Sequence, residues 1–115
     1  MCVYLPNNYH RESVELIYEL ISKHEQDKPG AAIIVLGDTN GVYLNLPCYK
    51  QYISCNTRKD KRLELCYCNY PNAYGKCFTR SPLGLADHDS IILLPTYKQK
   101  LKEFKPTIKE IKLWD

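Results

Sequence analysis

The sequence lacks the features that mark several classes of protein. No apolar run approaches the ~18 residues of a membrane-spanning helix, the six cysteines form no C-x-x-C pair, and the three histidines complete no zinc-ligand spacing. The first residues, Met-Cys-Val-Tyr, include neither a basic segment nor a long apolar stretch, so the sequence predicts no signal peptide. We therefore expect an intracellular protein without membrane contact, whose cysteines are reduced thiols.

The composition is that of a globular protein of one domain. Of the 115 residues, 44% are apolar and 25% are charged, and ten are tyrosines. The net charge of +3 arises in the segment from Tyr97 to Asp115, where six lysines face three acidic residues. Such a tail suits contact with an acidic polymer, although most charge runs are simply solvated.

The apolar pattern predicts a mixed α/β domain with one helix. Apolar side chains recur at helical spacing from Arg11 to His24, and Lys28-Pro29-Gly30 ends the helix. The predicted strands are, in chain order, 1–5, 32–36, 51–55, 62–68 and 91–94, and 71–82 is expected to be loop. Residues 32–36 are continuously apolar and are expected to be buried on both faces. The helix that precedes them fits a crossover between strands.

Two polar motifs adjoin apolar strands, and the first is Gly37-Asp38-Thr39-Asn40, which follows residues 32–36. Ligands gather at the carboxyl ends of strands in open α/β sheets. Asp38 is therefore expected to hold or activate a water, and Asn40 to donate a hydrogen bond to a phosphate oxygen. The alternative is an ordinary turn, because Gly, Asp and Asn are the residues that turns use.

The second motif is Asp87-His88-Asp89-Ser90, which precedes the apolar residues 91–94. A histidine beside an aspartate binds metal, relays protons or forms an ordinary hydrogen-bonded pair. Carboxylates for a cation, an imidazole for developing charge and an amide for orientation together suit divalent-metal hydrolysis of a phosphate ester. This hypothesis requires the strand ends that carry Asp38 and His88 to meet at one edge of a sheet.

Three further features are ambiguous from the sequence. Glu64 interrupts a strand of alternating apolar residues, and it either reaches a solvated edge or orients His88 from behind. Tyr4 is either a core or rim residue or a contact for phosphate. A basic cluster is expected to be a solvated hairpin tip, and it consists of Arg58, Lys59, Lys61 and Arg62.

Taken together, these motifs resemble the endonuclease/exonuclease/phosphatase superfamily, which has the DNase I-like fold. The resemblance is closest to the apurinic-type endonuclease domain of LINE-type, non-LTR retrotransposon polyproteins. Ile34 to Asn40 resembles the Gly-Asp-Phe-Asn motif of that family, and Pro82 to His88 resembles its closing Leu-Gly-x-Ser-Asp-His motif. The other segments that resemble the family are Val3 to Asn7, Tyr49 to Arg58, Arg62 to Tyr67, and Pro95 to Trp114. The last of them is similar to the linker that precedes reverse transcriptase. The order and spacing of several motifs together are more specific than any one alone.

The resemblance implies a magnesium-dependent phosphodiesterase that nicks DNA, with Mn²⁺ as an alternative cation. The same resemblance assigns the site residues. Asp38 orients or deprotonates the attacking water, Asn40 holds a phosphate oxygen, His88 stabilises the phosphorane, Glu64 supports the imidazole, Tyr4 contacts the scissile phosphate, and Asp87 lies near the metal. Glu64 stands where the family has Asp, and its side chain is one methylene longer.

The sequence also departs from the family, because it lacks the N-terminal half with its metal-binding Glu and one of two packed sheets. The resemblance therefore implies the C-terminal half of a four-layer α/β sandwich over residues 1–95 and a basic linker or tail over 96–115. We expect a truncated copy that binds Mg²⁺ weakly, does not cleave alone and self-associates through an uncovered sheet face. Its partners would be DNA and the reverse transcriptase region of the parent polyprotein. The alternatives are a remnant that binds nucleic acid without catalysis and a superfamily phosphatase acting on small phosphoesters.

Overall fold

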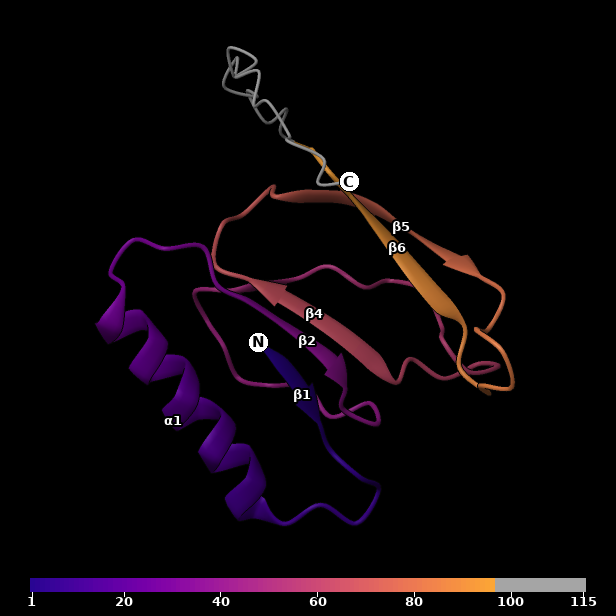
Figure 1. Ribbon diagram of the computed structural model, residues 1–115, viewed down its shortest axis with the longest axis horizontal. Helices are drawn as coiled ribbons and strands as arrows, with labels where there is room; N and C mark the ends of the chain where they lie inside the picture. The colour runs from indigo at the N-terminus through magenta and orange to yellow at the C-terminus, as the bar shows by residue number, and fades with distance from the viewer. Residues whose placement is uncertain (97–115) are drawn as a thin grey trace, which may run out of the picture.

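The computed structural model describes residues 1–96, which form one α-helix and two β-sheets (Figure 1). The elements are, in chain order, β1 (Cys2–Tyr4), α1 (Arg11–Asp27), β2 (Ile34–Asp38), β3 (Lys50–Gln51), β4 (Glu64–Cys68), β5 (Tyr74–Arg80) and β6 (Ser90–Pro95). The predicted mixed α/β class is therefore confirmed. The predicted basic linker over 96–115 lies, apart from Thr96, outside the described residues.

The larger sheet has the strand order β1-β2-β4-β3. β1 runs parallel to β2, and α1 connects the two strands, as the crossover prediction requires. β4 runs antiparallel to both β2 and β3. β5 and β6 pair with each other in a separate antiparallel hairpin. The hairpin and α1 flank the larger sheet, as Figure 1 shows.

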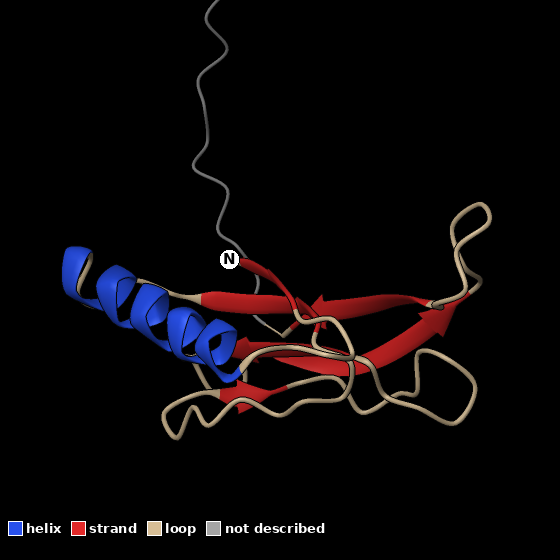
Figure 2. Ribbon diagram, turned by 90° about the horizontal axis from the view of Figure 1, so that it is seen from below, coloured by secondary structure: helices blue, strands red, loops and turns tan. Residues whose placement is uncertain are grey.

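Helix α1 packs against one face of the larger sheet (Figure 2). It is neither long nor apolar enough to cross a membrane. Its apolar stripe follows from the helical spacing seen in the sequence. The buried cluster formed there consists of Leu5, Ile17, Ile21, Val35, Leu44, Leu65 and Tyr67. Because burial of one large aliphatic side chain contributes about 1.5–3 kcal/mol, this cluster fixes β1, β2 and β4, which are the strands whose ends carry the site.

Gly37 lets β1 and β2 approach closely just before the site. Its φ is +153°, and a Cβ at this position would collide with the backbone of Val3, which is its partner on β1. A side chain here would push the strands apart, so the position requires glycine. The next residue is Asp38, and the glycine therefore sets where this carboxylate emerges from the sheet.

The hairpin β5–β6 covers part of the face opposite α1. A cavity of about 210 Å³ lies between hairpin and sheet, and its lining includes Leu36, Cys66, Ile91 and Leu93. On the β1 side of this face, Tyr4 and Leu36 stay 68% and 43% exposed. The prediction that residues 32–36 are buried on both faces is therefore wrong, because the hairpin does not extend over all of β1 and β2.

One predicted loop contains a strand, and one predicted strand is shorter than expected. The segment 71–82, predicted as loop, contains β5, which forms through its pairing with β6 and has an irregular register between Tyr74 and Cys77. Prolines on both sides and an internal glycine conceal this strand in the sequence. The predicted strand 51–55 is reduced to Lys50–Gln51. The side chain of Gln51 accepts from the backbone N–H of Ile53 (2.6 Å) and donates to its carbonyl (2.8 Å), which replaces ladder pairing there.

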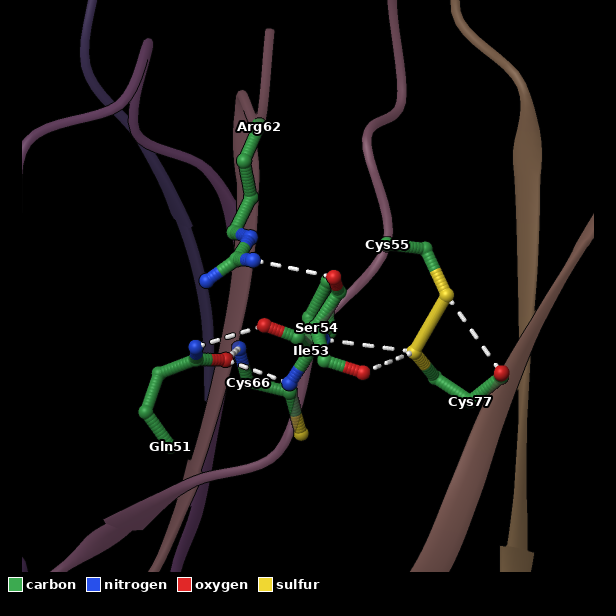
Figure 3. The surroundings of a disulfide bond; sticks show 7 residues. All are labelled: Gln51, Ile53, Ser54, Cys55, Arg62, Cys66 and Cys77. Atoms are coloured by element: carbon green, nitrogen blue, oxygen red, sulfur yellow. Dashed lines mark hydrogen bonds between the residues drawn. A yellow bond between two sulfur atoms is a disulfide. The ribbon is translucent and has the colours of Figure 1, made fainter. Parts of the chain in front are cut away.

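A disulfide bond joins Cys55 to Cys77 (Figure 3). The expectation of reduced thiols is therefore wrong for these two residues, whereas Cys2, Cys48, Cys66 and Cys68 are free. The bonded cysteines lie 22 residues apart on segments that meet only in the folded chain. Spacing along the sequence therefore gave no basis for the pairing.

Candidate active site

Three side chains from different parts of the chain converge at one edge of the larger sheet. Asp38 is the last residue of β2, Glu64 is the first residue of β4, and His88 lies in the loop before β6. A carboxylate oxygen of each acidic residue and a ring nitrogen of His88 all lie within 4.8 Å of one another. The structure thus brings together the two strand ends whose meeting the sequence hypothesis required.

The register of the sheet explains why two carboxylates meet here. Asp38 pairs directly with Glu64 in the antiparallel ladder between β2 and β4. Directly opposed residues of an antiparallel pair point to the same face, and like charges in that position destabilise a sheet. A positive group between them offsets this repulsion, and His88 occupies that place.

The imidazole of His88 is held mainly by Glu64. Its Nδ1 forms a hydrogen bond with Oε1 of Glu64, and the same nitrogen lies 3.8 Å from Oδ2 of Asp38. The hydrogen bond to Glu64 raises the pKa of His88 above the usual 6.5, and the charges of Glu64, Asp38 and Asp87 act in the same direction, while partial burial opposes them. The site therefore favours an imidazolium ion that is 23% exposed. Of the two sequence alternatives for Glu64, this geometry favours the one in which it orients His88.

Glu64 has a second oxygen that is suited to a cation. Oε2 is buried and accepts no hydrogen bond from the residues that the structure describes. A buried carboxylate oxygen without a partner is costly unless it meets a donor or a positive ion. Together with the carboxylate of Asp38, it forms an oxygen donor set that fits a hard divalent cation such as Mg²⁺ or Mn²⁺.

Asn40 shapes the turn that presents Asp38. Its backbone N–H donates to Oδ1 of Asp38 at 2.9 Å, and its side-chain amide donates to the carbonyl of Leu5 at the end of β1. The backbone of Asn40 is left-handed, with φ of 50°. The turn alternative therefore describes Asn40 well, while Asp38 keeps one carboxylate oxygen directed towards His88.

Tyr4 lies beside Asp38 but is not packed into the site. The two residues are partners in the parallel pairing of β1 with β2, which places their side chains on the same face of the sheet. Tyr4 is among the most exposed large side chains of the described chain. Its phenol is therefore accessible to a molecule bound over Asp38.

Asp87 sits on the other side of the imidazole. Its Oδ1 lies 3.6 Å from Nε2 of His88, and its Oδ2 lies 3.4 Å from Nε of Arg58. Asp87 thus stands apart from the carboxylates of Asp38 and Glu64, and part of its charge is balanced by Arg58. The basic cluster that the sequence placed on a hairpin tip begins beside the site. There, the backbones of Arg58 and Lys61 exchange two hydrogen bonds in a tight turn.

Thr57 is a residue that sequence reasoning missed. It is fully buried, its carbonyl accepts from the backbone N–H of Asp89 at 2.6 Å, and its hydroxyl accepts from the backbone N–H of Leu63 at 3.1 Å. These bonds tie the segment before the basic cluster both to the start of β4 and to the loop that carries His88. The sequence offered no signal for this role, because Thr57 lies outside both polar motifs and its partner Asp89 is distant in the chain.

Comparison with family models, with curated proteins and with solved structures gives no match to this chain.

Proposed function

We propose that this chain provides the catalytic corner of a metal-dependent phosphodiesterase, namely the DNA endonuclease of a retroelement with a DNase I-like fold. The observation that carries the proposal is the convergence of Asp38, Glu64 and His88 on one sheet edge. Two carboxylates beside an oriented imidazolium meet the needs of phosphodiester hydrolysis, in which a water must be activated and negative charge builds up on phosphorus-bound oxygens.

Four side chains of the site act on the attacking water and on the phosphate in this proposal, directly or through His88. Asp38 accepts a hydrogen bond from the attacking water and orients it, or takes its proton. Glu64 holds Nδ1 of His88, which keeps the ring charged and leaves Nε2 on the side of Asp87. His88 then donates from Nε2 to a phosphoryl oxygen as charge develops. Tyr4 contacts the same phosphate from the neighbouring strand.

The cation of the proposed site is Mg²⁺, with Mn²⁺ as the alternative. The oxygens of Asp38 and Glu64 would hold it, and Asp87, which the family resemblance places near the metal, would contribute from across the imidazole. A divalent cation bound there polarises a phosphoryl oxygen and neutralises developing charge. Binding is expected to be weak, because the donor set offers few carboxylates and Asp87 already pairs with Arg58.

DNA fits as the substrate because the basic cluster lies beside Asp87. Lysines and arginines that contact phosphates position a nucleic acid without reading its sequence. Arg58 reaches Asp87 from this cluster, so a strand held along it would pass close to His88. A phosphatase acting on small phosphoesters gains nothing from such a cluster, which is why we place it second.

We further propose that the 115 residues do not nick DNA by themselves. Tyr4 and Leu36 border the site where the sheet face emerges from under the hairpin, and both stay partly exposed. Apolar surface next to a catalytic site calls for a covering layer, from another polypeptide segment or from a second copy of the chain. Without that layer, the phosphate and the cation remain in water, where electrostatic stabilisation is weak.

The test uses an activated diester, bis(p-nitrophenyl) phosphate, because its low barrier reveals weak catalysis. We expect slow hydrolysis that requires Mg²⁺ or Mn²⁺ and falls by roughly 100-fold or more in Asp38→Asn and in His88→Ala. Asp60→Asn and His24→Ala are the matched controls and should hydrolyse the diester as the unmodified chain does. Plasmid DNA should remain uncut.

Three outcomes would redirect the assignment. Faster hydrolysis of the monoester p-nitrophenyl phosphate than of the diester would favour the small-molecule phosphatase. Binding of DNA that weakens steeply with salt, with no cation-dependent hydrolysis of either ester, would favour the non-catalytic remnant. Magnesium-dependent nicking of plasmid by the chain alone, abolished by Asp38→Asn, would show that it needs no covering layer.

A further inference from the structure

We propose that the Cys55–Cys77 disulfide is a redox-active site, and that its reduction by a dithiol releases the hairpin β5–β6, with the loop carrying His88, from the sheet that carries Asp38 and Glu64. The inference goes beyond the proposed function, because it concerns how the hairpin is attached and holds whatever the site binds. It rests on the topology of the two sheets and on the surroundings of the two sulfur atoms.

The hairpin is attached to the rest of the domain through side-chain and loop contacts, and not through a strand ladder. β5 and β6 pair only with each other among the strands of residues 1–96, so no ladder joins them to the larger sheet. Cys55 belongs to the segment that follows β3, and Cys77 lies in the middle of β5, with 6.6 Å between their Cα atoms. The disulfide is therefore the one covalent cross-link between the hairpin and the sheet in the described part of the chain. An edge-on contact of Tyr52 with Tyr74 adds a non-covalent link.

The disulfide is close in structure to the segment that positions His88. Thr57, two residues after Cys55, accepts the hydrogen bond from Asp89, which directly follows His88. On the other side, Cys77 pairs with Leu93 on β6, the strand that begins two residues after His88. Both ends of the cross-link therefore lead within a few residues to the loop of His88. Opening the bond removes the covalent constraint between these two segments and leaves hydrogen bonds such as that of Asp89 to Thr57.

The two sulfur atoms differ in a way that sets the direction of attack. Cys55 is partly exposed, whereas Cys77 is buried. The backbone N–H of Ser54 donates to Sγ of Cys77 at 3.2 Å, and the hydroxyl of Ser54 lies 3.1 Å from the same atom (Figure 3). Donors of this kind stabilise a thiolate, so Cys77 is the better leaving group and Cys55 is the sulfur that a reductant reaches.

The exchange balances as follows. A thiolate of the dithiol attacks Sγ of Cys55, the bond to Cys77 breaks, and its electron pair stays on Sγ of Cys77, which takes a proton from water. The second thiol of the reductant loses its proton and attacks the reductant sulfur in the mixed disulfide, which releases Cys55 as a thiolate that is protonated in turn. The protein disulfide is reduced by two electrons, and the dithiol is oxidised to its cyclic disulfide.

The neighbouring free thiols do not compete in this exchange. Cys66 is buried close to Ser54 and Ile53 (Figure 3), and burial and the neighbouring Cys68 raise the pKa of its thiol to about 11. A protonated thiol is a poor nucleophile, so Cys66 does not attack the disulfide at neutral pH. The pair Cys55–Cys77 therefore opens and closes without rearranging to other partners.

Hydrogen exchange of backbone amides, measured by NMR on the whole chain, tests the inference. After addition of dithiothreitol, the amide of Asp89 and those of β6 should exchange at least tenfold faster, and their acceleration should exceed that of the α1 amides, which follow only the loss of global stability. The double variant Cys55→Ser/Cys77→Ser should show the fast exchange with and without reductant. The control variant Cys48→Ser, which removes an exposed free thiol, should respond to dithiothreitol as the unmodified chain does.

Three results would overturn the inference. The first is exchange at Asp89 and β6 that reductant leaves unchanged. The second is equal acceleration of exchange in α1 and β6, because that result means unfolding of the whole domain rather than release of the hairpin. The third is mass spectrometry after alkylation that finds Cys55 and Cys77 both modified in protein kept with oxidised dithiothreitol.

Discussion

Asp38 and Glu64 face one another as cross-strand partners at the end of the β2–β4 ladder, and His88 reaches both carboxylates through its Nδ1. The imidazole comes from the loop between β5 and β6, which form a different sheet from the one that carries the two carboxylates. Its charge offsets the repulsion between two acids that the register forces together. The geometry that suits the chemistry thus also contributes to holding the hairpin in place.

Replacing Glu64 tests how the imidazole is held. Glu64→Gln keeps the length of the side chain but removes the charge and weakens the hydrogen bond, so the pKa of His88 should fall towards 6.5. Asp38→Asn should cause a smaller fall, because its carboxylate lies farther from the ring than that of Glu64. Asp87→Asn should cause the smallest, because its carboxylate is the most exposed of the three and is paired with Arg58. NMR titration of the histidine ring signals measures these changes. Equal falls in all three variants would contradict the dominant role of Glu64.

The raised pKa of His88 also predicts how stability depends on pH. Because folding raises this pKa, the stabilisation by the imidazolium is fully present below the unfolded value and is lost as pH rises through the folded value. Between about pH 6 and about pH 8 the urea midpoint should therefore decline more in the unmodified chain than in His88→Gln. Parallel declines would mean that the ion pairs of His88 do not stabilise the fold.

Much of the fold and of the site could be predicted from the sequence where a local pattern determines it. The helix follows from apolar spacing, and Glu64 was placed on the face opposite Leu65 and Tyr67 by the alternation of β4. The meeting of Asp38 with His88 was expected from the order of two motifs beside two strands. Such patterns are local, and the faces of helix and strand follow from them directly.

The remainder depends on contacts between distant segments, which leave no periodic trace. β5 forms because it pairs with β6. Its own residues include Gly75 and Lys76, which are of types that strands disfavour. The disulfide and the hydrogen bonds of Thr57 likewise join segments that meet only after folding. Asn40 had two interpretations, and only its bond to the carbonyl of Leu5 distinguishes the turn from a free side chain.

Gly37→Ala should destabilise the domain strongly. The added methyl group would meet the backbone of Val3 within the β1–β2 pair, where neither strand moves without disturbing the buried cluster. We expect a loss of more than about 2 kcal/mol in the free energy of unfolding. Gly75→Ala on β5 is the matched control, since its Cβ would find only ordinary contacts, the nearest at 3.6 Å to Thr96. Comparable losses in the two variants would argue against close packing at Gly37.

Leu36→Lys tests whether the uncovered sheet face mediates self-association. If this face is covered by a second copy, a charge at Leu36 places an unpaired ammonium in an apolar interface, and sedimentation velocity should show a shift towards monomer. Leu85→Lys changes a fully exposed leucine in a loop and should leave the distribution unaltered. A chain that is monomeric at all concentrations before any substitution would require the cover to come from another polypeptide.

Reduction of Cys55–Cys77 should lower the global stability as well as loosening the hairpin. The cross-link spans a sequence separation of 22 residues, and closing a loop of that size restricts the unfolded chain by about 3 kcal/mol. Urea unfolding with and without dithiothreitol measures the difference. The variant Cys55→Ser/Cys77→Ser should match the reduced protein, because in both the unfolded chain is free of the cross-link. A much smaller difference between the two free energies of unfolding would mean that other contacts keep these segments together in the reduced unfolded chain. The hairpin would then be held mainly by the native contacts around Ser54 and Thr57.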